Sequence, residues 1–110
     1  MEFLYLLTPT RPAMLTEGPT EAESAAVGRH FAYLQQLEAA GSLILAGRTT
    51  ENTQHTIGLA IFNAKDEAAA RAIMLADPAV VAGVMQAELR PYRVALCCQA
   101  NIVRAKESAA

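Results

Sequence analysis

The fold of this chain is decided by residues 20–47, which read TEAESAAVGRHFAYLQQLEAAGSLILAG. Thr20 and Glu23 form a capping box, in which a threonine caps a helix and a glutamate follows three residues later. The predicted helix ends before Gly41, since glycine is the usual residue after a helix C-terminus. Residues 42–47 predict a strand. One long helix therefore leads directly into a strand.

Further strands are predicted on both sides of this segment from apolar runs bounded by turn residues. Residues between the first strand and the helix are rich in proline and glycine and predict a loop, as do the polar residues after the second strand. The predicted strands are residues 2–8, 42–47, 57–62 and 84–96, the last interrupted near Pro91.

A second helix is predicted between the third and fourth strands. Asn63 is expected to cap it, and Asp66 lies in its first turn, where the helix dipole favours negative charge. Pro78 disfavours helical geometry at the preceding residue. We therefore expect Asp77 to cap a new short turn with proline at its first position.

The element order β-α-β-β-α-β predicts a ferredoxin-like α+β fold, with an antiparallel sheet and both helices on one face. A length of 110 residues fits one domain. We place it at residues 1–98 and expect residues 99–110 to form a frayed tail. Aromatic residues make up only 5% of the chain, so the core is thin. We expect the bare sheet face, rich in alanine, leucine and isoleucine, to be covered by a second copy in a homodimer.

Composition excludes several classes of function. The net charge of −2 and scattered arginines argue against nucleic-acid binding. Apolar runs are too short to span a membrane, and the first residues lack the basic region of a signal peptide. Cys97 and Cys98 are adjacent, a geometry that rarely allows a disulfide, so we expect free thiols in a reducing cytoplasm. No phosphate loop, metal-ligand cluster or nucleophile elbow is recognised, so neither metal nor cofactor is predicted.

His30 and Asp77 are the candidate catalytic residues. His30 falls within the apolar stripe of the first helix, formed with Val27, Phe31, Leu34 and Leu37, and a buried imidazole needs a polar partner. Antiparallel packing of the two helices predicts that Asp77 lies near it. Imidazole exchanges protons near neutral pH and can act as general acid or base, with the aspartate fixing its tautomer. The alternatives are a structural histidine and a plain helix cap. Asp77 can fill both its roles only through separate carboxylate oxygens.

Arg48 and Thr49 follow the end of the second strand and are candidate substrate-binding residues. Arginine binds carboxylates or phenolates through a two-pronged contact. Arg11 and Arg90 are further candidates for the same role. The alternative for all of them is a solvated loop or strand position.

Several short pieces, in their order and spacing, resemble the YCII (YciI-like) family. They are residues 30–34 (HFAYL), 40–49 (AGSLILAGRT), 76–78 (ADP) and 90–92 (RPY). The resemblance implies a dimeric α/β-barrel-type association and a pocket around His30 and Asp77. One relative in the family is a dehydrochlorinase acting on a chlorinated hydroxyhydroquinone, and the fold relative muconolactone isomerase moves protons on a small lactone. The chain departs from common family forms at Arg48 and Thr49, where Gly-Pro is frequent.

Three functions fit these observations. The first is a cofactor-independent enzyme in which His30 exchanges a proton with a small anionic ring compound, Asp77 orients it and Arg48 binds the charge. Elimination, isomerisation and lactone chemistry all suit such a site. The second is a non-catalytic ligand-binding or regulatory module that uses the same pocket. The third is a cofactor-free oxygenase of the dimeric ferredoxin-like type.

Overall fold

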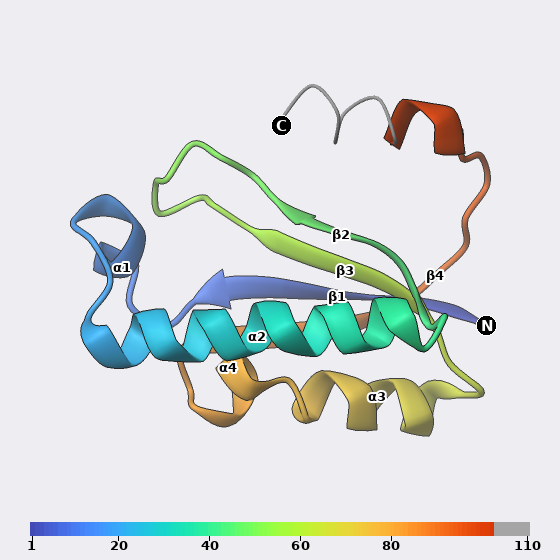
Figure 1. Ribbon diagram of the computed structural model, residues 1–110, viewed down its shortest axis with the longest axis horizontal. Coiled ribbons are helices and arrows are strands. Elements are labelled where there is room, and N and C mark those ends of the chain that lie inside the picture. Colours follow the sequence, from blue (N-terminus) through green and yellow to red (C-terminus); the bar gives the residue numbers. More distant parts are fainter. Residues whose placement is uncertain (103–110) are drawn as a thin grey trace.

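The computed structural model describes residues 1–102, and its two longer helices lie on one face of a single sheet (Figure 1). The four strands are antiparallel and ordered β2-β3-β1-β4. This arrangement confirms the predicted ferredoxin-like α+β fold. The elements are β1 (Glu2–Pro9), α1 (Ala13–Thr16), α2 (Glu21–Ala39), β2 (Leu43–Arg48), β3 (Gly58–Asn63), α3 (Glu67–Leu75), α4 (Pro78–Val81) and β4 (Met85–Tyr92).

The core lies between the sheet and the helix layer. Alternate residues of a strand point to opposite faces of a sheet. In β1 the buried residues Phe3, Tyr5 and Leu7 therefore point toward the helices. They pack with Phe62 of β3 and Met74 of α3. The Tyr5 and Phe62 rings meet edge to face, with centroids 5.6 Å apart.

Helix α2 begins as the capping box predicts. The Thr20 hydroxyl accepts a hydrogen bond from the backbone N–H of Glu23, and the Glu23 carboxylate accepts one from the backbone N–H of Thr20. The helix ends at Ala39, and Gly41 follows with a φ of +81°, which favours glycine.

The buried stripe of α2 differs from the prediction. Val27 and Phe31 are 38% and 62% exposed, whereas Ala26 is buried. His30 lies one helical turn after Ala26 and is half-buried. The buried face of α2 therefore centres on Ala26 rather than on Val27 and Phe31. His30 stays on the side that faces the core.

Helix α3 and the segment before α2 also correct the prediction. Asp66, not Asn63, caps α3, and its carboxylate accepts the Ala69 N–H at 2.8 Å. Asn63 instead stays in β3, where it pairs with Glu2. The segment predicted as a loop before α2 contains the short helix α1, which buries Met14.

The C-terminal end differs too. Strand β4 continues through Pro91, which pairs with Phe3, and ends at Tyr92 rather than at residue 96. Proline is tolerated because β4 is an edge strand. Residues 99–102, predicted as part of a frayed tail, form a helical turn (Figure 1). The rest of that predicted tail, residues 103–110, lies outside the described residues.

Two further predictions concern the surface of the molecule. Cys97 and Cys98 are both free and exposed, as their adjacency predicts. No helix within residues 1–102 combines the length and the apolar character that crossing a membrane requires.

Candidate acid–base site

His30 and Asp77 meet beneath the helix layer. The His30 Nδ1 atom lies 2.6 Å from Asp77 Oδ2. The Asp77 side chain is fully buried, and the His30 side chain is 16% exposed. Helices α2 and α4 pack against each other (Figure 1), which joins two residues 47 positions apart in the sequence. The predicted proximity of the two side chains is confirmed.

Asp77 fills two roles with two oxygens. It is the N-cap of α4, and its Oδ1 atom accepts the Ala79 N–H at 3.0 Å. Pro78 occupies the first helical position, where its lack of an N–H costs nothing. Oδ2 is therefore left to face His30. The helix cap holds the carboxylate in place, so capping and the contact with histidine are compatible.

Tyr5 is a third partner that sequence reasoning missed. Its hydroxyl donates to Asp77 Oδ2 at 2.8 Å inside the core. Burial raises the pKa of Tyr5 well above its ordinary value, and the negative charge of Asp77 raises it further. The phenol therefore stays protonated and acts as a donor. Strand alternation places Tyr5 on the buried face, and a buried tyrosine hydroxyl needs a partner, so the signal was present in β1.

The contacts assign the proton positions on the His30 ring. An ionised carboxylate only accepts hydrogen bonds, so Nδ1 carries the proton directed at Asp77. Nε2 has no hydrogen bond to residues 1–102. Within the same residues no buried side-chain nitrogen or oxygen lacks a partner, so Nε2 reaches the surface. This atom can accept or donate a proton.

The negative charge of Asp77 also acts on Tyr33, which donates its hydroxyl to the backbone oxygen of Ile73 at 2.7 Å. Burial raises the pKa of Tyr33, and the nearby Asp77 charge raises it further.

Among residues 1–102 no group of three or more histidine, cysteine or acidic side chains is placed to hold a metal ion.

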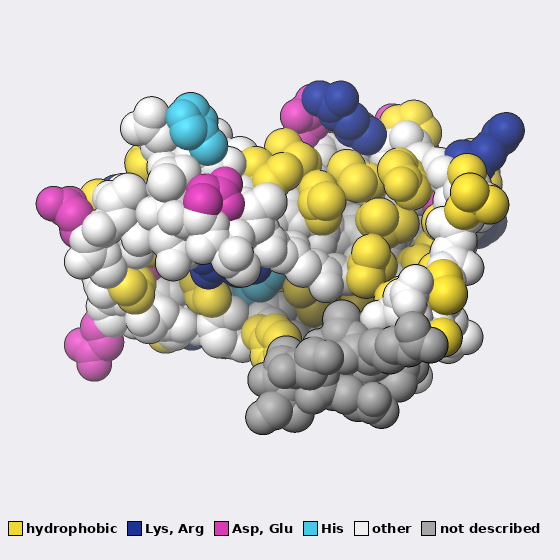
Figure 2. Space-filling model, turned by 90° about the horizontal axis from the view of Figure 1, so that it is seen from above, with side chains coloured by type: hydrophobic (Ala, Val, Ile, Leu, Met, Phe, Trp, Pro, Cys, Tyr) yellow, Lys and Arg dark blue, Asp and Glu magenta, His cyan; other side chains and the backbone are white. Residues whose placement is uncertain are grey.

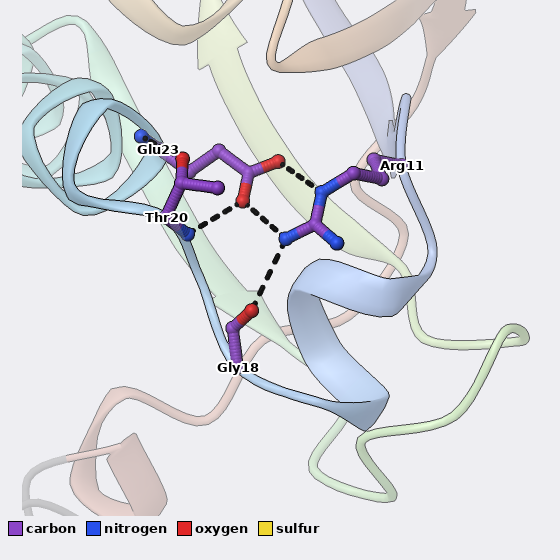
Figure 3. A network of polar contacts seen from close by, with 4 residues as sticks. All are labelled: Arg11, Gly18, Thr20 and Glu23. Carbon is purple, nitrogen blue, oxygen red and sulfur yellow. Dashed lines mark hydrogen bonds and ion pairs between the residues drawn. The ribbon is translucent and has the colours of Figure 1, made fainter.

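Arg11 lies in a separate network at the start of α2 (Figure 3). Its guanidinium binds both carboxylate oxygens of Glu23, at 2.9 and 2.6 Å, and the backbone oxygen of Gly18 at 3.1 Å. The hydrogen bonds from Arg11, and then the one from the Thr20 N–H, lower the pKa of Glu23 to about 2. Arg11 thus fastens the α1 segment to α2, and it has no hydrogen bond to His30 or Asp77.

The other substrate-binding candidates are placed as follows. Arg48 donates to the backbone oxygen of Thr49 and to the Asn52 side chain. Arg48 and Thr49 line a hollow of about 280 Å³, whose lining does not include His30 or Asp77. Arg90 pairs with Glu88 on β4. Its register partner is Leu4, so it points to the sheet face opposite the helices. Within the described chain, none of these residues hydrogen-bonds to His30 or Asp77.

A ferredoxin-like sheet with a histidine and a buried aspartate paired under its helices defines a small α+β protein with a candidate acid–base site. The chain belongs to the YCII-related domain family, whose model matches residues 1–93. No curated protein is matched by sequence.

A solved structure shares the fold. It is the 5-chloro-2-hydroxyhydroquinone dehydrochlorinase (TftG) from Burkholderia phenoliruptrix AC1100, in complex with 2,5-dihydroxybenzoquinone. The TM-score is 0.64 at 22% sequence identity, and the similarity covers 84% of this chain and 94% of that one. At this identity the likeness establishes the fold alone.

Proposed function

We propose that this chain is a cofactor-independent enzyme that moves a proton on a small ring compound through His30 Nε2. The observation that carries the proposal is the 2.6 Å contact between His30 Nδ1 and a fully buried carboxylate. This contact orients the ring and leaves one nitrogen for chemistry. Histidine held in this way by a carboxylate is a recurrent general acid–base device.

The proposed chemistry is a reversible proton transfer. Nε2 takes a proton from an acidic C–H or O–H of the ring compound, and the imidazolium that forms is stabilised by Asp77 Oδ2. The same nitrogen then returns the proton, to another atom of the compound or to its leaving group. Elimination, isomerisation and lactone chemistry all use this pair of steps. Ala79 and Tyr5 also donate to Asp77, so the carboxylate keeps its position while the imidazole gains and loses the proton.

The proposed substrate class is a small ring compound with acidic hydroxyl or carboxyl groups. The structural relative is described as a dehydrochlorinase and as a complex with a dihydroxybenzoquinone, which supports a ring of this kind. We keep Arg48 and Thr49 as proposed contacts for the anionic group, although the hollow that they line in one copy does not include His30 or Asp77. Arg11 and Arg90 are already paired with Glu23 and Glu88, so we assign them no substrate role.

We propose in addition that two copies associate through the sheet face opposite the helices. Leu45 on this face is 44% exposed, and Leu4, Leu6 and Leu59 are half-buried. Figure 2 shows hydrophobic side chains gathered on the surface seen from above. A face of this character costs free energy in water, and a second copy removes it from solvent.

Turnover tests the enzymatic proposal. Hydroxylated and carboxylated ring compounds are incubated with wild-type protein and with His30→Gln, which keeps a polar side chain at the site. We expect a compound that the wild type converts and the variant does not. A ligand that binds both proteins with equal affinity and is never converted would favour the non-catalytic binding module instead.

A further inference from the structure

We infer that Tyr5 is a positioning residue of the acid–base site: its hydroxyl fixes the Asp77 oxygen that holds His30 and sets how strongly that oxygen binds the imidazole. The inference rests on the proposed function, since it concerns the same site.

The geometry places two donors on one oxygen. Asp77 Oδ2 accepts from the Tyr5 hydroxyl at 2.8 Å and from His30 Nδ1 at 2.6 Å. Asp77 Oδ1 is held separately by the backbone N–H of Ala79 at 3.0 Å. A carboxylate held at both oxygens from two different elements cannot rotate about its terminal bond without breaking a buried hydrogen bond. The imidazole therefore meets an oxygen of fixed position.

Burial makes the Tyr5 contact effective. Tyr5 and Asp77 are both 0% exposed, so no water replaces the phenol as a donor. Strand β1 lies inside the sheet between β3 and β4, and the Tyr5 ring packs against Phe62. The hydroxyl is consequently presented to Asp77 by a rigid part of the fold rather than by a loop.

Sharing an oxygen has an electrostatic consequence. The Tyr5 hydroxyl donates a hydrogen bond to Oδ2 and partly neutralises its negative charge. The oxygen then stabilises an imidazolium less strongly. Asp77 is the only charged side chain in hydrogen-bond or ion-pair contact with His30 among residues 1–102. Tyr33 lies near this charge but donates to the Ile73 carbonyl, not to the carboxylate. Loss of the Tyr5 hydroxyl should thus act on His30 in a way that loss of the Tyr33 hydroxyl does not.

The test is an NMR titration of the His30 ring in wild type, Tyr5→Phe and Tyr33→Phe. The chain has two histidines, so His55→Gln assigns the signals. We expect Tyr5→Phe to move the His30 titration curve to higher pH by about half a unit or more. The Nδ1 proton resonance should move downfield as its hydrogen bond strengthens. Tyr33→Phe should leave both unchanged. Equal curves in wild type and Tyr5→Phe, or equal shifts in both variants, would overturn the inference.

A second measurement uses wild-type protein alone and decides the question even when Tyr5→Phe does not fold. With 13C-labelled tyrosine, the Cζ resonance of Tyr5 should follow the titration of His30, because both groups share Oδ2. A Tyr5 signal that stays flat while His30 titrates would overturn the inference. Neither readout needs a substrate. Failure to find turnover would therefore count against the proposed function and leave the result for Tyr5 standing.

Discussion

Asp77 belongs both to the fold and to the proposed acid–base site. Its two carboxylate oxygens are divided between the α4 cap and the pair formed by His30 and Tyr5. Any substitution at this position therefore acts on stability and on the site. The two effects can be separated, because the chain contains a second aspartate that only caps a helix.

Asp77→Asn tests the division of labour. Asparagine is as good an N-cap as aspartate. With its one oxygen capping α4, however, it presents an NH2 group rather than an acceptor to Tyr5 and His30, and it carries no negative charge. We expect loss of turnover of about 10³-fold or more, as when the carboxylate that orients a catalytic histidine is neutralised. Asp66→Asn is the matched control, since Asp66 caps α3 through the same kind of contact. Equal activity in the two variants would contradict the orienting role of Asp77.

Truncation at the same position measures the buried contacts. Asp77→Ala removes the acceptor of three donors in a fully buried position. We expect a loss of about 2–4 kcal/mol in the free energy of unfolding, measured by urea denaturation. A loss smaller than that of an exposed cap, about 1 kcal/mol, would show that water or a rearrangement replaces these contacts.

At the scale of elements, the start of α2 is a second structural centre of the chain. Thr20→Ala removes the hydroxyl that accepts the Glu23 N–H. Loss of such a cap costs about 1 kcal/mol of protein stability. Ser24→Ala is the control, because Ser24 lies one turn further along the same helix and is exposed. Equal unfolding midpoints in urea for Thr20→Ala and Ser24→Ala would contradict the capping role.

The ion pair between Arg11 and Glu23 predicts a pH dependence of stability. The pKa of Glu23 is lowered to about 2 in the folded protein, mainly by Arg11. A lowered pKa means that the ionised form stabilises the fold above the ordinary carboxyl range, and that this stabilisation is lost as the pH falls toward 2. The difference in Tm between wild type and Glu23→Gln should therefore be largest above about pH 5 and shrink toward pH 2.

Arg11→Gln is the control for this pH dependence, because it removes the main cause of the lowered pKa. Its stability should fall less steeply with acid than that of the wild type. A Tm difference between wild type and Glu23→Gln that is constant from pH 2 to pH 6 would contradict the account.

Much of this element layout follows from local chemistry, and the exceptions depend on how the strands pair in the sheet. The capping box, Gly41 and the Asp77-Pro78 start of α4 are short-range signals that are legible in the sequence. Asn63 and Asp66 are both good caps, and only the pairing of β3 with β1 shows that Asn63 belongs to the strand. Pro91 in β4 was misread because the tolerance of an edge strand depends on its place in the sheet.

At the scale of the molecule, topology brings the site together. His30 and Asp77 are joined by the packing of two helices that the β-α-β-β-α-β order predicts. Tyr5 comes from the strand beneath them. Strand alternation places it on the buried face, but only the folded chain shows that its hydroxyl meets Asp77. The arginine candidates show the same limit, because Arg11 and Arg90 have acidic partners that only the folded chain reveals.

The proposed dimer gives a prediction at this scale. The wild type should sediment at twice its chain mass of 11.7 kDa. Leu45→Glu puts a charge on the sheet face and should yield monomers. Leu75→Glu is the matched control, since Leu75 is also an exposed leucine, 54% against 44%, but lies on α3. Sedimentation of both variants as dimers, or of the wild type as a monomer, would contradict association through this face.

The central claim is that His30 Nε2 transfers protons, and hydrogen–deuterium exchange measures this directly. Dihydroxybenzoquinone and related ring compounds that bind the protein in a thermal-shift screen are incubated in D₂O, and deuterium uptake at their ring carbons is followed by NMR. The account predicts that the wild type accelerates deuterium uptake and that His30→Gln does not. The rate with the wild type should also change with pH as His30 is protonated. Compounds that bind the wild type but exchange no faster than with His30→Gln would contradict it and leave the protein a ligand-binding module.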